Sequence, residues 1–573
     1  MKKTLIVLST LVVMAGLLIH QYLRPASAPA SQIFINATVL TMDSDNTTAE
    51  AVALEGNKIV AIGSNQEISQ RIRSDSLVYD LQGKTLMPGF IDAHGHFPAS
   101  GLFAVHADLR SPPMGQITSL NQLQQILSNK LTTKAPGEWV VGTGYDDTLL
   151  AERRHPTRQD LDAVSSEHPI FIVHTSLHMG VANTLALETL GITRDTPNPV
   201  GGVIAKDPDT GELTGLLEET AINATMQQAM DFSLSELRLL LTTAIDEYAA
   251  AGVTLAQNGG APSTMLKGVS LVSKLNLIPF RLELWPMLNK QDPDQFQALM
   301  QGDFSGGDYE SDLSRVNRVK VIADGSIQGY TGYLSKPYHT HFRNNPYYRG
   351  YPTQPRDELV KQVSALHQQG YRIAIHGNGD AAIDDIIYAF AKALEQRPDP
   401  DPRFIVIHSQ MAREDQLLKM KQLGITPSFF SAHTYYWGDR HRDFFMGPIR
   451  AARMSPTKSA ENLGLPYSVH MDTPVAPMEP LTLVWSTVNR VSTSGRVIGK
   501  EQRVSAQQAL RAVTIDAAYQ IFRDHELGSI EVGKLADLVV LSQNPMAVDP
   551  MAIKDIEVTQ TIVNGVTIFS NES

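Results

Sequence analysis

Both ends of the chain carry short runs in which apolar and polar residues alternate. Residues 33–42 are rich in β-branched side chains, and residues 51–62 form two apolar runs joined by a glycine–asparagine turn. Residues 558–569 repeat this pattern around an asparagine–glycine pair. Alternation around such a turn is typical of β-hairpins. We therefore predict one small β-sandwich built from residues 32–87 and 525–573.

The long middle of the chain alternates apolar runs with helical patterns. Residues 356–369 and 381–395, for example, have helical patterns and lie between candidate strands. Repeated strand–helix units predict the α/β class, and eight of them predict a (β/α)8 TIM-type barrel, here over residues 88–524. The candidate strands are the one that enters His94 and those at 252–256, 278–284, 316–323, 371–376, 403–408, 425–430 and 466–471.

A long segment separates the first candidate strand of the barrel from the second. It contains two further apolar runs, residues 139–146 and 169–178, which have the character of strands. Insertions at the mouth of a barrel commonly shape the substrate pocket. We therefore expect an inserted subdomain at about residues 100–250.

The composition narrows the classes of partner and cofactor. The chain has 573 residues, of which 42% are hydrophobic, enough for a buried core and more than one domain. Its formal net charge is -12 and it has no long basic run, so we expect no nucleic-acid partner. It contains no cysteine, which excludes disulfides and thiolate metal sites. A metal would have to be held by histidine, carboxylate or a modified lysine.

The first thirty residues have the features of a targeting segment. Lys2 and Lys3 precede an apolar run from Leu5 to Ile19, and small residues follow near Ala28. This order is typical of a signal peptide, while the length of the run leaves an uncleaved membrane anchor as the alternative. We expect residues 1–30 to direct export, with the protein either in a bacterial periplasm or anchored in the inner membrane.

Side chains that can bind metal follow several of the candidate strands. His94 and His96 are two residues apart, so on an extended strand they point to the same side and can meet one ion. Catalytic groups of a barrel gather at the carboxyl ends of its strands. One such residue alone is commonly an ordinary polar side chain, but their joint occurrence in barrel order favours a metal site. The candidate ligands are His94, His96, Lys320, His376, His408 and Asp472.

Several motifs resemble those of the metal-dependent amidohydrolase superfamily. They are Pro88–His96, His376–Asp380, Ile407–Gln410, Asp472–Val475 and the C-terminal Leu527–Val539. The chain is most similar to the amidohydrolase-3 branch, which contains the N-substituted formamide deformylases and the exoenzyme-regulatory-type proteins. The resemblance covers nearly everything after residue 32.

The resemblance implies a role for each candidate ligand. His94 and His96 would bind the more buried metal. His376 and His408 would bind a second one, or His408 would contact the substrate instead. Lys320 would bridge as a carbon dioxide adduct, because a plain ammonium group has no lone pair for a metal. One or two divalent ions are implied, with zinc first and manganese, iron and nickel as alternatives.

The resemblance also implies the chemistry of the site. The metal would activate a water molecule, and Asp472 would take its proton and pass it to the leaving amine. His178 could donate a hydrogen bond to a carbonyl oxygen. His433 and His470 lie near strand ends as second-layer or structural residues. The candidates for substrate contact are Tyr145, Asp146, His178 and Asn183.

These observations predict an exported metal-dependent amidohydrolase with a small-molecule amide substrate. The scissile bond would be a C–N amide-type bond, as in an N-substituted formamide or an N-acyl amine. One alternative is a related hydrolase of a cyclic amide or ester. Another is a non-catalytic periplasmic binding or regulatory protein on the same scaffold. The sequence leaves the substrate open and is compatible with a homo-oligomer.

Overall fold

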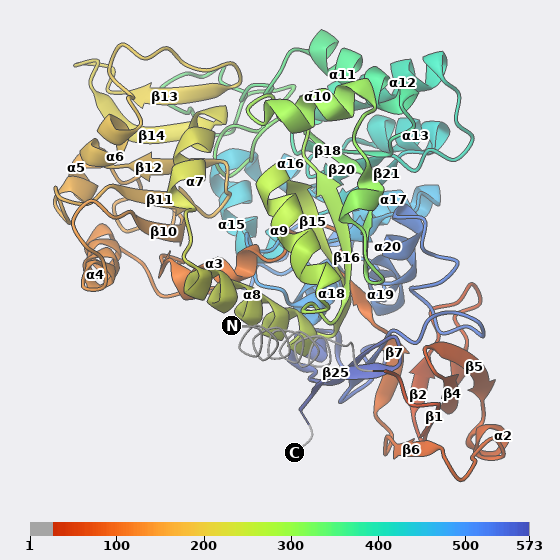
Figure 1. The fold of residues 1–573 in the computed structure, drawn as a ribbon. Coiled ribbons are helices and arrows are strands. Elements are labelled where there is room, and N and C mark those ends of the chain that lie inside the picture. Colours follow the sequence, from red (N-terminus) through yellow and green to blue (C-terminus); the bar gives the residue numbers. More distant parts are fainter. Residues whose placement is uncertain (1–26, 572–573) are drawn as a thin grey trace, which may run out of the picture.

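The computed structural model describes residues 27–571, so most of the expected targeting segment, residues 1–26, lies outside the described part. None of the described helices is both long enough and apolar enough to cross a membrane. Figure 1 shows three regions: a small β-rich region near the C-terminus, a larger α/β region, and a lobe of residues from about 100 to 230 beside it.

Two sheets form the small β-rich region, and the second of them contains strands from both ends of the chain. Apolar side chains of both sheets, such as Phe34, Leu54 and Val540, share one buried cluster. The first sheet has the order β5 (Lys58–Gly63), β4 (Ala51–Glu55), β1 (Ser31–Ile35), β6 (Leu77–Asp80). The second has the order β25 (Val566–Ser570), β24 (Val558–Val563), β23 (Leu538–Leu541), β7 (Thr85–Pro88), β2 (Thr38–Leu40), β3 (Thr48–Ala49).

The α/β region contains two parallel sheets rather than one continuous sheet. A parallel bridge between Met287 and Lys320 joins the two sheets on one side. On the other side, the backbone N–H of Asp472 donates to the carbonyl of His94. The sheets have the orders β17 (Ser314–Val316), β16 (Arg281–Pro286), β15 (Val253–Ala261), β8 (Phe90–Ile91), and β18 (Val319–Ile322), β19 (Ile373–Gly377), β20 (Ile405–His408), β21 (Thr426–Phe429), β22 (Ser468–Val469).

The prediction of one unbroken strand over residues 316–323 is wrong. β17 ends at Val316 and β18 begins at Val319. Arg318, in the break, is buried and donates to the backbone carbonyls of Arg403 and Gln520. The break divides the parallel strands into two sheets, and the closed eight-stranded barrel stays a prediction.

Helices lie between the parallel strands along the chain and cover them from outside (Figure 1). The two helices expected from their patterns are confirmed as α11 (Arg356–Gln368) and α12 (Asp380–Gln396). Their apolar faces pack into the main core with strand residues such as Ile375. The other long helices of this region are α8 (Leu234–Ala250), α9 (Ser263–Lys274), α10 (Pro293–Gln301), α13 (Glu414–Leu423) and α18 (Pro480–Asn489).

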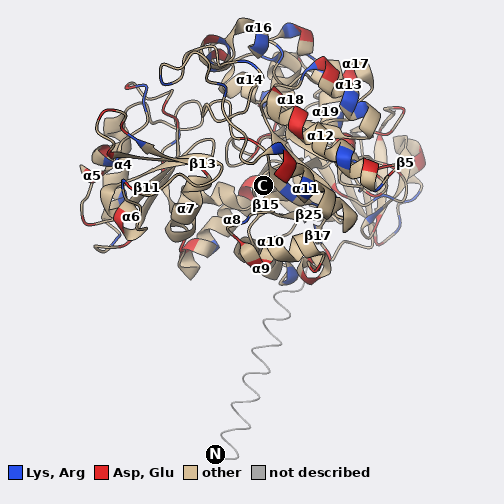
Figure 2. Cartoon of the chain, turned by 90° about the horizontal axis from the view of Figure 1, so that it is seen from above, with Lys and Arg blue, Asp and Glu red and all other residues tan. Residues whose placement is uncertain are grey.

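The segment between β8 and β15 contains a mixed six-stranded sheet of its own. Its strand order is β13 (Gly202–Lys206), β14 (Leu213–Glu219), β12 (Met179–Ala182), β11 (Ile170–His174), β10 (Val140–Tyr145), β9 (Ala107–Asp108). Helices α4 (Leu120–Leu131), α5 (Arg158–Asp162) and α6 (Thr184–Thr189) accompany it. We call residues 100–233 the inserted lobe. In the view of Figure 2, acidic and basic residues are mixed over the helices.

Candidate metal centre

The loop after β8 brings two imidazoles against one carboxylate. The Nε2 atoms of His94 and His96 lie 3.5 Å and 3.2 Å from Oδ1 of Asp472. Asp472 follows β22, the last strand of its sheet, and its backbone is held by the carbonyl of His94. His94 is completely buried, and Asp472 nearly so. The first and last parallel strands therefore deliver three potential ligands to one point.

Lys320 of β18 adds an amine to this group. Its Nζ lies 3.0 Å from Nε2 of His94, and the side chain is buried. Burial lowers the pKa of Lys320 to about 7, and the negative charge of Asp472 offsets only part of this effect. A lysine with so low a pKa is substantially neutral at pH 7 and has a free lone pair.

A second pair of imidazoles lies next to the first. His376 is the penultimate residue of β19 and His408 is the last of β20, and Nε2 of His408 lies 3.1 Å from Nδ1 of His376. The rings of His94 and His408 are 5.5 Å apart between centroids, which joins the two groups. Adjacent parallel strands place their ends side by side, so the neighbouring positions of these rings follow from the pairing of β19 with β20.

The separations and the protonation states of these nitrogen and oxygen atoms suit a divalent metal ion. Two nitrogen ligands at 2.0–2.1 Å from a tetrahedral zinc ion are about 3.3 Å apart, close to the separations within both groups. Oδ1 of Asp472 is buried and has no hydrogen-bond partner among residues 27–571. Burial, followed by nearby positive groups, lowers the pKa of His94, His376 and His408 well below the ordinary value. Neutral imidazoles keep the lone pair that a metal needs.

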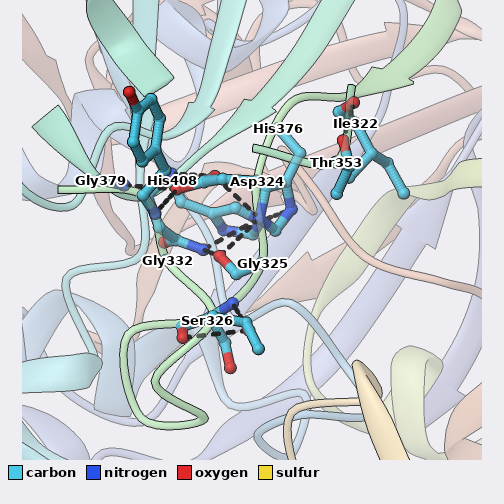
Figure 3. Close-up of polar contacts among 12 residues, drawn as sticks. Ile322, Asp324, Gly325, Ser326, Gly332, Thr353, His376, Gly379 and His408 are labelled. Carbon is cyan, nitrogen blue, oxygen red and sulfur yellow. Dashed lines mark hydrogen bonds and ion pairs between the residues drawn. The ribbon is translucent and has the colours of Figure 1, made fainter. Parts of the chain in front are cut away.

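Asp324, which follows β18, holds the loop after β19 in place. Its carboxylate accepts hydrogen bonds from the backbone N–H groups of Asn378, Gly379 and Tyr333. Figure 3 shows Asp324 and Gly325 beside His376, whose Nε2 lies 3.2 Å from the Gly325 carbonyl. Burial raises the pKa of Asp324 to about 7, against these hydrogen bonds. This carboxylate therefore orients the loop that follows His376.

His470 lies behind the second pair of imidazoles. Its Nε2 is 3.0 Å from Nδ1 of His408, and its Nδ1 is 2.8 Å from the hydroxyl of Ser428. Both contacts are buried, so they fix the ring of His408 from the side away from His376. Partners of this kind orient the ligands of metal sites. His470 thus supports the ring of a candidate ligand, which is one of the two roles, supporting or structural, expected from the sequence.

A small pocket opens beside the second pair. Residues on its wall include His178, Gln328, His376, Asn378, His433 and Asp472. His178 enters from the inserted lobe, with its ring 4.9 Å from that of His376. Its Nδ1 lies 2.8 Å from Oε2 of Glu219. Burial is the largest single effect and lowers the pKa of His178, but the negative groups of Glu219, Asp472 and Asp324 together raise it, so the net direction is upward.

Tyr145 and Asp146 lie deeper in the inserted lobe than we expected for substrate contacts. The Tyr145 hydroxyl is 3.1 Å from Nδ1 of His155. Asp146 accepts hydrogen bonds from the indole N–H of Trp437 and from Thr148. These contacts connect the lobe to the segment after β21, and neither residue is on the pocket wall.

Asn183 is held entirely by backbone groups. Its Oδ1 accepts from the N–H groups of Ile170 and Ala186, and its amide nitrogen donates to the carbonyls of Ser165 and His168. The residue is the N-cap of α6 and is fully buried. An amide with all four hydrogen-bonding positions occupied has none for a substrate. In this structure Asn183 therefore caps α6, and its expected contact with substrate stays a prediction.

Asp146, Asp147 and His174 form another group with metal-binding side chains. The backbone N–H of Ser176 donates to Nδ1 of His174, so the ring proton is on Nε2, which lies 3.1 Å from Asp147. A protonated nitrogen cannot bind metal. Arg440 also lies 3.7 Å from Asp146. The group is therefore best described as a hydrogen-bonded network.

Sequence reasoning missed Glu219, Gln328 and Asn378. Gln328 and Asn378 follow strands that supply candidate ligands. A search for polar side chains a few residues beyond each strand end would therefore have found them. Glu219 gave no such signal. It ends β14 of the inserted lobe, and its contact with His178 depends on the pairing of two strands that are distant in sequence.

Comparison with known proteins agrees with this geometry. Residues 77–569 match the amidohydrolase family. The N-substituted formamide deformylase of Arthrobacter pascens is 28% identical over 93% of this chain and 97% of its own length. The putative amidohydrolase YtcJ of Bacillus subtilis is 25% identical over 93% of this chain and 98% of its own length.

A solved structure of a metal-dependent hydrolase has a similar fold. A metal-dependent hydrolase from Pyrococcus horikoshii superposes with a TM-score of 0.71 and 22% sequence identity. The superposition covers 91% of this chain and 99% of that protein. Since the family match alone spans most of the sequence, this chain belongs to the amidohydrolase family and is a metal-dependent hydrolase of carbon–nitrogen bonds.

Proposed function

We propose that this protein hydrolyses the amide bond of an N-substituted formamide or another small N-acyl amine. The observation that carries the proposal is the convergence of His94 and His96 on Oδ1 of Asp472, at 3.5 Å and 3.2 Å, with Nζ of Lys320 3.0 Å from Nε2 of His94. The relative from Arthrobacter pascens, whose name specifies N-substituted formamides, supports the substrate class. Zinc is the first candidate metal, because imidazole and carboxylate ligands suit it.

The residues of the site divide into holding and reacting groups. His94, His96 and Asp472 would hold one ion, and His376 with His408 would hold a second. Lys320, as a carbon dioxide adduct, would bridge them, and its low pKa supplies the neutral amine that the adduct requires. When bound, a metal ion would lower the pKa of its water ligand to about 7 and would polarise the carbonyl group of the substrate.

Asp472 carries out the proton transfers. Its carboxylate reaches the pocket wall, so it can accept the proton of the attacking water and deliver it to the departing nitrogen. His178 faces the same pocket from the opposite lobe and would contact the carbonyl group of the substrate. Asp472 is buried and the side chain of His178 is only 17% exposed, so little bulk water reaches them and their electrostatic effects are stronger than in water.

The experiment combines metal analysis with a substrate panel. Purified protein is analysed for bound metal and assayed with N-alkylformamides, N-acyl amines, cyclic amides and esters. We expect one or two equivalents of zinc and turnover of the open-chain amides. Turnover of cyclic amides or esters alone would replace the proposed substrate class. Bound metal without turnover of any panel member would favour the binding-protein alternative.

A matched variant pair makes this test specific. His376→Asn removes a proposed ligand. His367→Asn is the control: it removes a buried imidazole in the last turn of α11 that bonds to the backbone carbonyl of Arg397. Only His376→Asn should lower the metal content.

For localisation, we propose export through residues 1–30. Cell fractionation and N-terminal sequencing of the mature protein test this, and a protein found only in the cytoplasm would contradict it.

A further inference from the structure

The inserted lobe places a carboxylate behind the one imidazole that it contributes to the pocket. Nδ1 of His178 lies 2.8 Å from Oε2 of Glu219, and the backbone N–H of Glu219 donates to the carbonyl of His178. The two residues are therefore connected through both backbone and side chain. Their side chains are 17% and 4% exposed.

Among residues 27–571, no lysine or arginine side chain forms an ion pair with the carboxylate of Glu219. Within residues 27–571, His178 is the only hydrogen-bond partner of its carboxylate, and Oε1 is buried without any. Burying a carboxylate is costly unless it is paired. A residue used only for packing would not need to be ionisable at this position, so the carboxylate points to a role that involves His178.

The backbone of Glu219 is in a conformation that favours glycine. Its φ is 53° and its ψ is -123°. A residue held in such a sparsely populated region is strained and persists where the surrounding structure enforces it, commonly at active sites. The preceding residue, Glu218, instead bonds to Arg343 and Tyr351. The strained turn at the end of β14 thus accompanies a carboxylate that bonds to the pocket histidine.

The neighbouring loop leaves room for this carboxylate. A Cβ atom on Gly325 would lie 2.0 Å from Oε1 of Glu219, so a side chain there would displace the carboxylate. Gly325 is also the residue whose carbonyl contacts His376. The carboxylate of Glu219 is therefore packed against the loop that borders the candidate metal centre.

From these contacts we propose that Glu219 is a positioning residue for His178. Its carboxylate accepts a hydrogen bond from Nδ1–H of His178, which fixes the ring and leaves Nε2 for the substrate. A carboxylate with this task holds an imidazole in one orientation and one proton arrangement. The inserted lobe thereby contributes a prepared two-residue unit to the site. This inference rests on the proposed amide hydrolysis only for its kinetic test.

The first test observes the ring directly and needs no turnover. Zinc-loaded protein enriched in ¹⁵N-histidine is compared with a His178→Asn variant by NMR, which identifies the His178 signals. We expect a proton on Nδ1 in the wild type and in Glu218→Gln, with exchange or loss of that signal in Glu219→Ala. A wild-type ring with no proton on Nδ1 overturns the proposal.

The second test is a double-mutant cycle on a substrate from the panel. Glu219→Ala should lower kcat/KM by about 10–100-fold at unchanged zinc content, and Glu219→Gln, which keeps an acceptor oxygen, by less. In a His178→Ala background, Glu219→Ala should cost less than about threefold, because there is no ring left to position. Equal losses in both backgrounds would show a merely structural role and overturn the proposal.

Glu218→Gln is the matched control, because Glu218 is an equally buried carboxylate one residue away that does not contact His178. Its kcat/KM should stay within about threefold of the wild type, as expected for a group outside the reacting contacts. If the wild type turns over no panel member, the proposed function fails, while the NMR comparison still decides the role of Glu219.

Discussion

Oδ1 of Asp472 lies 3.2 Å from Nε2 of His96, although the two residues follow the last and the first of the parallel strands. Neither sheet alone contains both residues, so the contact exists only when the two sheets are arranged side by side. This dependence makes the metal centre sensitive to the packing that surrounds it. Chemistry, metal binding and stability can nevertheless be tested separately.

Asp472→Asn should lower kcat by about 10²–10⁴-fold, because the amide cannot accept the proton of the attacking water. Zinc should remain largely bound, since asparagine keeps an oxygen at this position and the imidazoles are untouched. Steady-state kinetics and metal analysis on the same preparation measure both effects. A variant with full kcat would reject the role of Asp472 as the base.

Gly259→Ala should reduce both metal content and activity. A Cβ at this position would lie 2.3 Å from ring atoms of His94, which is too close for the ring to stay in place. Gly268, in α9, is the control, because a Cβ there meets nothing within 4 Å. Gly268→Ala should raise stability by about 0.5–1 kcal/mol and leave the metal bound. Full zinc content in Gly259→Ala would contradict the close approach of Gly259 to His94.

The stability of the metal-free protein should rise with pH because of Lys320. Burial lowers the pKa of this lysine from 10.5 to about 7. Between these values the unfolded chain binds more protons than the folded chain, so unfolding becomes less favourable as the pH rises. Below the folded pKa, the folded state has to bury a charged amine.

Urea unfolding in buffers free of carbon dioxide measures this effect. Between pH 7 and pH 9 the wild type should gain about 2 kcal/mol relative to Lys320→Met, which has no proton to lose. The difference between the two proteins removes the contributions of other titrating groups. Parallel pH profiles for the wild type and the variant would show that Lys320 keeps an ordinary pKa.

The ion pair of Arg281 and Asp537 should stabilise the junction of β16 with the β-rich region. Nε of Arg281 is 2.6 Å from Oδ2 of Asp537, and both side chains are 4% exposed. Arg281→Met leaves an unpaired buried carboxylate and should cost about 3–5 kcal/mol. Lys392→Ala, which breaks a solvent-exposed pair with Glu395, should cost much less, because water screens the exposed charges. Urea unfolding compares them, and equal losses would contradict the difference in burial.

The local pattern of the sequence determined much of the fold and most of the metal centre. Apolar runs and helical repeats located α11, α12 and most of the parallel strands, because periodicity depends only on neighbouring residues. The spacing of His94 and His96, and the position of His376 and His408 near strand ends, indicated candidate ligands for the same reason. Resemblance to known motifs then supplied the expected roles.

Only the tertiary structure decided the contacts between distant segments. It divided the strand at Arg318, whose side chain bonds to loops far along the chain. It assigned Asn183 to a helix cap and paired Glu219 with His178. Such outcomes depend on which polar groups meet after the chain has packed. A single residue has the same local pattern whether its partner is a substrate, a backbone amide or another side chain, so the sequence could not distinguish them.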